Sequence, residues 1–211
     1  MNELQSLYKK DYPIFIEPYL YSKSMQRLKG VDMNCGLQFT SHSGFSSYGS
    51  YSRYDHSVGV ACIIWHFTHD KKQTLAGLFH DISTRVFSHV IDFVKNDYLI
   101  QESTEDETRK ILLQDVGIMN QLLRDGISVD EVSDYHVYPI ADNDSPRLSS
   151  DRLEYTLGNL LNYRKRKIKE IEKYYNDLVV GVLEDGSKEI MFQNPEIAEE
   201  FAFGALSCGM I

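Results

Sequence analysis

The chain has 211 residues and a formal net charge of −9, with 42% hydrophobic and 25% charged residues. These values are typical of a globular chain that buries its own core, and they exclude a disordered or collagen-like protein. The negative charge argues against general nucleic-acid binding, which needs a basic face, but it allows a small phosphorylated substrate held by local cations.

The N-terminal part, residues 1–54, is predicted to be an irregular segment that packs on the rest of the chain. Pro13, Pro18 and a Gly/Ser/Tyr-rich run at 40–54 favour turns over long helices. The pattern then changes, because apolar residues recur at helical spacing and indicate an amphipathic helix over 55–69. After a polar break at 70–72, a short apolar helix should begin at Thr74 and end just before His80 and Asp81.

Four short helices are expected next, at 88–94, 105–113, 118–123 and 129–132. Prolines and clustered acidic or amide residues mark 138–148 as a loop. Ser149 or Ser150 should then cap a long helix whose first turn contains Asp151.

The C-terminal part is predicted to contain a helix that runs through Tyr174 to Leu178, then a β-hairpin with strands at 179–183 and 188–192, then a helix at 195–206. The Asp185-Gly186 pair between two apolar runs is typical of a hairpin turn. The chain ends on an apolar segment at 209–211, so we expect part of the natural protein to be missing. The expected fold class is all-α, with one small hairpin.

Cellular location is predicted from what the sequence lacks. The first 11 residues are polar rather than signal-like, and no apolar run reaches the roughly 20 residues of a membrane span. Cys35, Cys62 and Cys208 form no paired motif and favour reduced core thiols. We therefore expect a cytoplasmic protein with no membrane partner.

The pair His80-Asp81 is the strongest indication of function, with His56 lying 24 residues upstream and Asp151 lying 70 residues downstream. An adjacent imidazole and carboxylate at a helix end point into nearly the same volume. Two further ligands from distant helices would complete a four-ligand site for a divalent cation. An isolated histidine is more often structural, and His66 in particular is expected to pack on the core stripe of its helix.

Three segments carry a resemblance to a known family: 52–60 around His56, 78–89 around the His-Asp pair, and 148–155 around Asp151. In this order they resemble the HD-domain metal-dependent phosphohydrolases, nearest the branch of the deoxynucleoside triphosphate triphosphohydrolases. Residues 18–20 and 25–28 also resemble the N-terminal stretch of that branch. The resemblance implies an HD-domain helical bundle in a single domain, with a metal-binding core at 55–165 and the helix, hairpin and helix at 166–211.

The resemblance also implies one divalent transition metal held by His56, His80, Asp81 and Asp151. Two imidazoles and two carboxylates suit Mn, Fe, Ni, Co or Zn better than Ca, which prefers oxygen ligands alone. A cation with an open coordination position favours hydrolysis of a phosphate ester.

Further roles follow from the same resemblance. Asp81 and His89 would be catalytic, with His89 as the general acid, and the substrate would be bound by Arg53, Arg152 and Tyr155. Arg53 is alternatively an ordinary surface or capping arginine, and Tyr155 a core aromatic. The chain departs from the branch at Thr84 and Thr104, which occupy histidine positions, and at Asn159, which occupies an aspartate position near the sugar.

Two functional interpretations remain open. In the first, metal-activated water hydrolyses the phosphate ester of a nucleotide or a similar small metabolite, with help from Glu102, Glu105 or Glu107. In the second, the chain is a metal- or nucleotide-binding HD protein with weak or no catalysis and a regulatory role. A helical interaction module without a site would require the four ligands to be scattered. The expected partners are a small phosphorylated substrate and no nucleic-acid polymer, and the hairpin and last helix are candidates for a homodimer contact.

Overall fold

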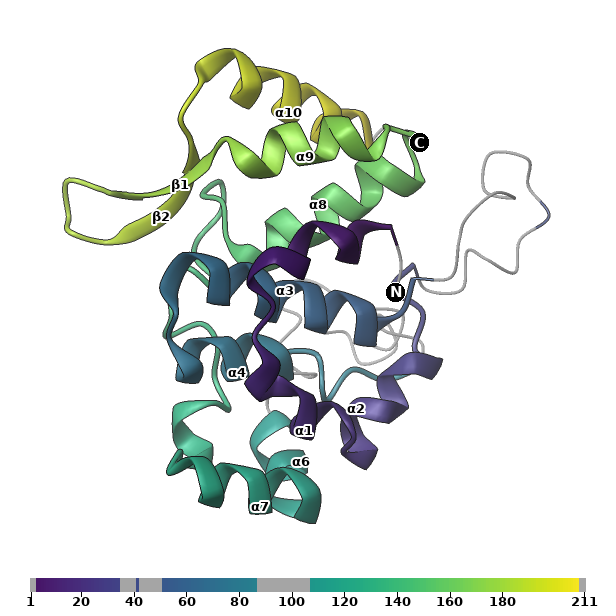
Figure 1. Cartoon of the computed structure of the whole chain (residues 1–211), viewed down its shortest axis with the longest axis vertical. Coiled ribbons are helices and arrows are strands. Elements are labelled where there is room, and N and C mark those ends of the chain that lie inside the picture. Colours follow the sequence, from purple (N-terminus) through teal and green to yellow (C-terminus); the bar gives the residue numbers. More distant parts are fainter. Residues whose placement is uncertain (1–2, 35–40, 42–50, 87–106, 209–211) are drawn as a thin grey trace, which may run out of the picture.

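The computed structural model describes residues 3–34, 41, 51–86 and 107–208 (Figure 1). Within these ranges the chain is mostly helical, with nine α-helices and a C-terminal two-stranded antiparallel hairpin. This confirms the predicted fold class. The α-helices are α1 (Glu17–Leu20), α2 (Lys23–Arg27), α3 (Arg53–Thr68), α4 (Lys71–Phe79), α6 (Thr108–Gln114), α7 (Val116–Asp125), α8 (Ser150–Asn162), α9 (Ile168–Asn176) and α10 (Pro195–Cys208).

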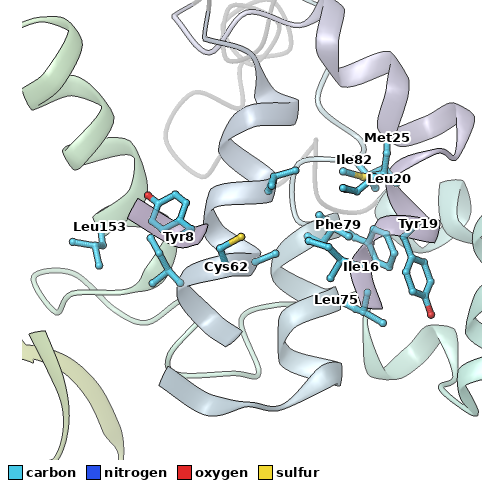
Figure 2. Packing of buried hydrophobic residues seen from close by; sticks show 14 of the residues in the cluster. Tyr8, Ile16, Tyr19, Leu20, Met25, Cys62, Leu75, Phe79, Ile82 and Leu153 are labelled. Carbon is cyan, nitrogen blue, oxygen red and sulfur yellow. The ribbon is translucent and has the colours of Figure 1, made fainter. Parts of the chain in front are cut away.

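The N-terminal segment is more regular than predicted, because short helical turns occupy most of residues 4–30. They are the 3₁₀ helices η1 (Leu4–Asp11), η2 (Ile14–Ile16) and η3 (Leu28–Gly30), together with α1 and α2. None of these helices is longer than eight residues, in agreement with the expectation from Pro13 and Pro18 that this segment forms no long helix. Tyr8, Ile16, Tyr19 and Met25 from this segment are buried in the main core (Figure 2). The short turns therefore form one wall of that core.

Helices α3 and α4 form the centre of the molecule and carry the first predicted ligands. The Ser52 hydroxyl accepts from the backbone of Asp55, whose carboxylate accepts in return, so α3 begins at Arg53 rather than Asp55. The predicted break before α4 is its N-cap, because Asp70 accepts from the backbone N–H groups of Lys72 and Gln73. The helix therefore begins three residues before Thr74.

His66 packs on the core only at its edge, where its ring lies 5.5 Å from the ring of the buried Tyr175. Helix α3 is buried from His56 to Ile64, but its last turn emerges from the core, and the His66 side chain is 44% exposed. Its Nδ1 lies 3.5 Å from Oδ2 of Asp11.

Three of the four expected middle helices lie within the described residues, and the fourth, at 88–94, lies outside them. They are α6, α7 and the 3₁₀ helix η6 (Val129–Glu131). Asp115 determines where α7 begins, because its carboxylate accepts from the backbone N–H groups of Gly117 and Ile118. The same carboxylate accepts from the backbone of Ser24, which ties α7 to α2.

The C-terminal elements follow the prediction with one correction. Leu178 belongs to strand β1 (Leu178–Val182) instead of the preceding helix, because it pairs with Phe192 of β2 (Lys188–Phe192). Gly186, at φ 82°, forms the hairpin turn. Helix α10 packs on α8 and α9 (Figure 1). Cys62 is buried and free as expected, whereas Cys208 is a free thiol that is only partly buried.

The predicted division into three parts of a single domain stays a prediction. Among the described helices, none combines the length and the hydrophobicity that a bilayer crossing requires.

Candidate metal centre

Helix ends bring the predicted ligands to one place. His56 lies in the first turns of α3, His80 and Asp81 follow the end of α4, and Asp151 lies in the first turn of α8. The Ser149 hydroxyl caps α8 by accepting from the backbone of Arg152. Ser52 caps α3 in the same way. Because these two caps fix where α3 and α8 begin, they also fix the direction in which the side chains of His56 and Asp151 leave the helices.

One nitrogen or oxygen from each of His56, His80 and Asp151 forms a cluster whose atoms all lie within 4.8 Å of one another. Nε2 of His56 lies 3.2 Å from Nε2 of His80 and 2.9 Å from Oδ1 of Asp151. Nε2 of His80 lies 3.8 Å from the same Asp151 oxygen. These three residues are therefore not scattered, which removes the condition for a helical module without a site.

The Asp81 carboxylate lies beside the same two imidazoles. Its Oδ2 lies 3.5 Å from Nε2 of His80 and 3.9 Å from Nε2 of His56. Ligands placed roughly 2.0–2.2 Å from one cation are about 3.0 Å apart at right angles and about 4.2 Å apart on opposite sides. The five distances, from 2.9 to 3.9 Å, lie close to this range.

The two imidazoles are held through their Nδ1 atoms, so both Nε2 atoms face the centre. Nδ1 of His80 donates to the carbonyl oxygen of Gly77 at 2.7 Å. Nδ1 of His56 lies 2.6 Å from Oε2 of Glu154, a buried carboxylate of α8 that the sequence analysis did not single out. Its spacing from Asp151 is the signal that was missed, because three residues along a helix return to the same face.

His56 shares the charge of the carboxylates around it. Burial lowers the pKa of His56, but hydrogen bonds to Asp151 and Glu154 outweigh burial and raise that pKa to about 10. Burial likewise opposes ionisation of Asp151, yet the hydrogen bond from His56 keeps its pKa below the usual range. In the metal-free protein a protonated His56 therefore offsets part of the carboxylate charge. Nitrogen and oxygen donors around such a charge fit a divalent transition metal.

Arg53 contacts Asp81, a predicted metal ligand, rather than solvent. Its Nη1 lies 2.9 Å from Oδ2 and 3.1 Å from Oδ1 of Asp81, and the two side chains are 8% and 9% exposed. Burial would raise the pKa of Asp81, but the Arg53 guanidinium and the two imidazoles hold it well below the usual range. The alternative of a surface arginine is therefore wrong for Arg53.

Thr84 also contacts Asp81, since its hydroxyl donates to Oδ1 at 2.7 Å. In the sequence this threonine is apparent only as the loss of a histidine. The structure shows that it fixes one carboxylate oxygen, while the other oxygen faces both imidazoles.

Arg152 and Tyr155, the other predicted substrate ligands, lie on α8 beside Asp151. Arg152 donates to the backbone carbonyls of Arg147 and Asn143 and pairs with Asp142 at 3.2 Å. These contacts hold the loop before α8 in place. Tyr155 is 36% exposed rather than a core aromatic. Contact of either residue with a substrate stays a prediction.

The loop between η6 and α8 adds aromatic residues that the sequence analysis missed. The Tyr135 ring lies 5.1 Å from the His80 ring and 4.3 Å from the His136 ring. No spacing or motif in the sequence connects these residues to the centre, so only the fold reveals them. His89, Thr104, Glu102 and Glu105 lie outside the described residues.

Comparisons with known proteins agree with this centre at the level of a distant relationship. The chain is 29% identical over 169 residues to the uncharacterized protein YdhJ of Bacillus subtilis, covering 78% of the chain and 49% of that protein. It is 28% identical over 167 residues to the metal-dependent phosphohydrolase cns2 of Cordyceps militaris, covering 79% of the chain and 46% of that protein. No family model matches the chain.

The chain is thus a distant homologue of a protein named as a metal-dependent phosphohydrolase. It spans about half the length of the curated relatives it matches.

Proposed function

We propose that the chain contains the catalytic core of an HD-type metal-dependent phosphohydrolase. In this proposal His56, His80, Asp81 and Asp151 hold one divalent transition metal, and the substrate is a phosphate ester of a nucleotide or a similar small metabolite. Branch membership among the triphosphohydrolases is not part of the proposal, because Thr84, Thr104 and Asn159 depart from that branch.

The observation that carries the proposal is the convergence of ligand atoms from three helices. The two Nε2 atoms and two carboxylates come from segments up to 95 residues apart, yet the two Nε2 atoms lie 3.2 Å from each other and 2.9–3.9 Å from an oxygen of each carboxylate. When bound, the cation would supply Lewis-acid chemistry, lowering the pKa of a water molecule and polarising a phosphoryl oxygen.

The role of Arg53 follows from its contact with Asp81. A cation bound by Asp81 would weaken the attraction of this carboxylate for the guanidinium, and Arg53 would then be able to contact a substrate phosphate. A guanidinium suits this task because its planar donors match the oxygens of phosphate. Tyr155 and Arg152 of α8 would border the substrate, while His89 remains our candidate for the general acid.

The test is hydrolysis of a panel of phosphate esters and nucleotides by the purified chain, with added Mn²⁺, Co²⁺ or Ni²⁺. Asp81→Asn should abolish the metal-dependent activity. Asp185→Asn is the matched control, because this aspartate lies in the hairpin turn and forms its hydrogen bonds with Ser187. Activity that survives Asp81→Asn would show that the hydrolysis comes from another site or a contaminant.

A binding protein with weak or no catalysis is the second candidate, favoured by the two threonines at histidine positions. It predicts that the chain binds one metal ion per molecule, with a loss of affinity in Asp81→Asn, but hydrolyses no member of the panel.

A further inference from the structure

Behind the candidate centre lies a buried group that the metal chemistry itself does not use. It consists of Tyr51, which precedes α3, and Glu154 of α8. The Tyr51 hydroxyl donates to Oε2 of Glu154, and the same oxygen lies 2.6 Å from Nδ1 of His56. Tyr51 is 5% exposed and Glu154 is 1% exposed.

A carboxylate so deeply buried is costly unless it is fully hydrogen-bonded. Burial raises the pKa of Glu154, and the hydrogen bond from His56 opposes that change. A carboxylate in this place needs a reason beyond packing, because an apolar side chain would avoid the cost of burial.

Two glycines on facing helices make room for this group. A Cβ atom on Gly59 of α3 would lie 2.3 Å from Oε1 of Glu154, and a Cβ atom on Gly158 of α8 would lie 3.3 Å from the Tyr51 ring. Any larger residue at position 59 would displace the Glu154 carboxylate from His56. The space that Glu154 and Tyr51 occupy between α3 and α8 therefore depends on glycine at positions 59 and 158.

The backbone of Tyr51 is also fixed. Its carbonyl accepts from the N–H of Met33 at 2.9 Å, and the neighbouring N–H of Arg53 donates to Val31 at 2.8 Å. Asp32 and Ser52 form an isolated antiparallel bridge between the same two segments. These backbone hydrogen bonds hold Tyr51 in place, so that its hydroxyl is positioned to donate to Glu154.

We propose that Glu154 is a positioning residue for His56, and that Tyr51 holds the Glu154 carboxylate in place. With Nδ1–H donated to Glu154, the His56 ring is oriented and Nε2 faces His80 and Asp151. A carboxylate partner also makes the imidazole a stronger ligand than a carbonyl partner does. At the corresponding nitrogen His80 donates to the carbonyl of Gly77 instead of a carboxylate, so the two imidazoles are supported unequally. The inference rests on the proposed function, since it assigns His56 as a metal ligand.

The test is Mn²⁺ titration of the whole chain and its variants, followed by the electron paramagnetic resonance of free Mn²⁺. Glu154→Gln should raise the Kd for Mn²⁺ about 10–100-fold, and Tyr51→Phe should raise it in the same direction by a smaller factor. Tyr8→Phe is the matched control, because the buried Tyr8 hydroxyl has no hydrogen-bond partner within the described part of the chain. Its Kd should equal that of the unaltered chain.

A spectroscopic signature separates positioning from a purely structural role. In the Zn²⁺-loaded, ¹⁵N-labelled chain, long-range proton–nitrogen spectra should show His56 protonated at Nδ1. In Glu154→Gln the resonance of this proton should shift strongly towards that of an ordinary imidazole.

The outcomes distinguish this inference from the proposed function. If the unaltered chain binds no Mn²⁺, the metal site itself is refuted. If it binds one Mn²⁺ ion and both Glu154→Gln and Tyr51→Phe bind equally well, the site stands and the positioning role is refuted. If Glu154→Gln does not fold, Tyr51→Phe decides: weakened binding supports the inference and unchanged binding overturns it.

Discussion

Replacement of Arg53 by methionine tests the electrostatic balance of the centre. The change leaves Asp81 buried without the guanidinium that lies 2.9 Å from Oδ2. Removing one partner of a buried ion pair costs about 3–5 kcal/mol. We expect the lower end, about 3 kcal/mol, because Thr84 and the protonated His56 still face the carboxylate. For a chain of this length that loss lowers Tm by about 6–12 °C.

The same variant should bind Mn²⁺ more tightly, because Arg53 and the cation compete for Oδ2 of Asp81. We expect a Kd about tenfold lower, equivalent to about 1.4 kcal/mol. Hydrolysis of a phosphate ester should fall nonetheless, since the guanidinium proposed for the substrate is gone.

Thermal and urea unfolding of the chelator-treated protein, with calorimetric titration of Mn²⁺, measure both effects. Arg109→Met is the control: Arg109 pairs with Asp130 at 2.7 Å, but the two side chains are 58% and 72% exposed. An exposed pair contributes about 0–1 kcal/mol. The reasoning is refuted if Arg53→Met is no less stable than Arg109→Met, or if it binds Mn²⁺ more weakly than the unaltered chain.

Three further predictions concern protons and hydrogen bonds. Because the pKa of His56 is raised to about 10 from 6.5, its charge should stabilise the metal-free protein fully below about pH 6.5 and progressively less as the pH rises towards 10. Urea unfolding across this range should show the loss, and its absence would contradict the assigned partners. For the same reason Mn²⁺ binding at pH 7.5 should release about one proton, measured by calorimetry in buffers of different ionisation enthalpy. Asp115→Ala should cost about 0.5–2 kcal/mol of unfolding free energy, because it removes the cap of α7 and the bond to Ser24; an unchanged urea midpoint would rule out this role.

Local sequence signals located the elements around the centre but not their contacts. Periodicity and capping residues placed α3, α4 and α8 to within a few residues, because those signals depend on neighbours along the chain. The polar residues before α4 were taken as a break, although Asp70 is its cap. Leu178 was assigned to a helix, although its pairing with Phe192 makes it part of a strand.

The four proposed ligands came from a resemblance, and the structure adds what surrounds them. Glu154 and Thr84 contact His56 and Asp81 directly, yet each is an ordinary residue in its own segment. Tyr135 reaches His80 only because the loop before α8 folds back onto the end of α4. The Glu154–His56 and Tyr135–His80 contacts join residues 98 and 55 positions apart, whereas Thr84 lies only three residues after Asp81.

Anomalous diffraction from crystals grown with Mn²⁺ would show whether the four proposed ligands share one cation. The account predicts one strong peak about 2.0–2.2 Å from Nε2 of His56, Nε2 of His80 and an oxygen of Asp151, with Asp81 as the fourth ligand. A fully loaded crystal with no peak among these atoms, or with its peak at other residues, would contradict it.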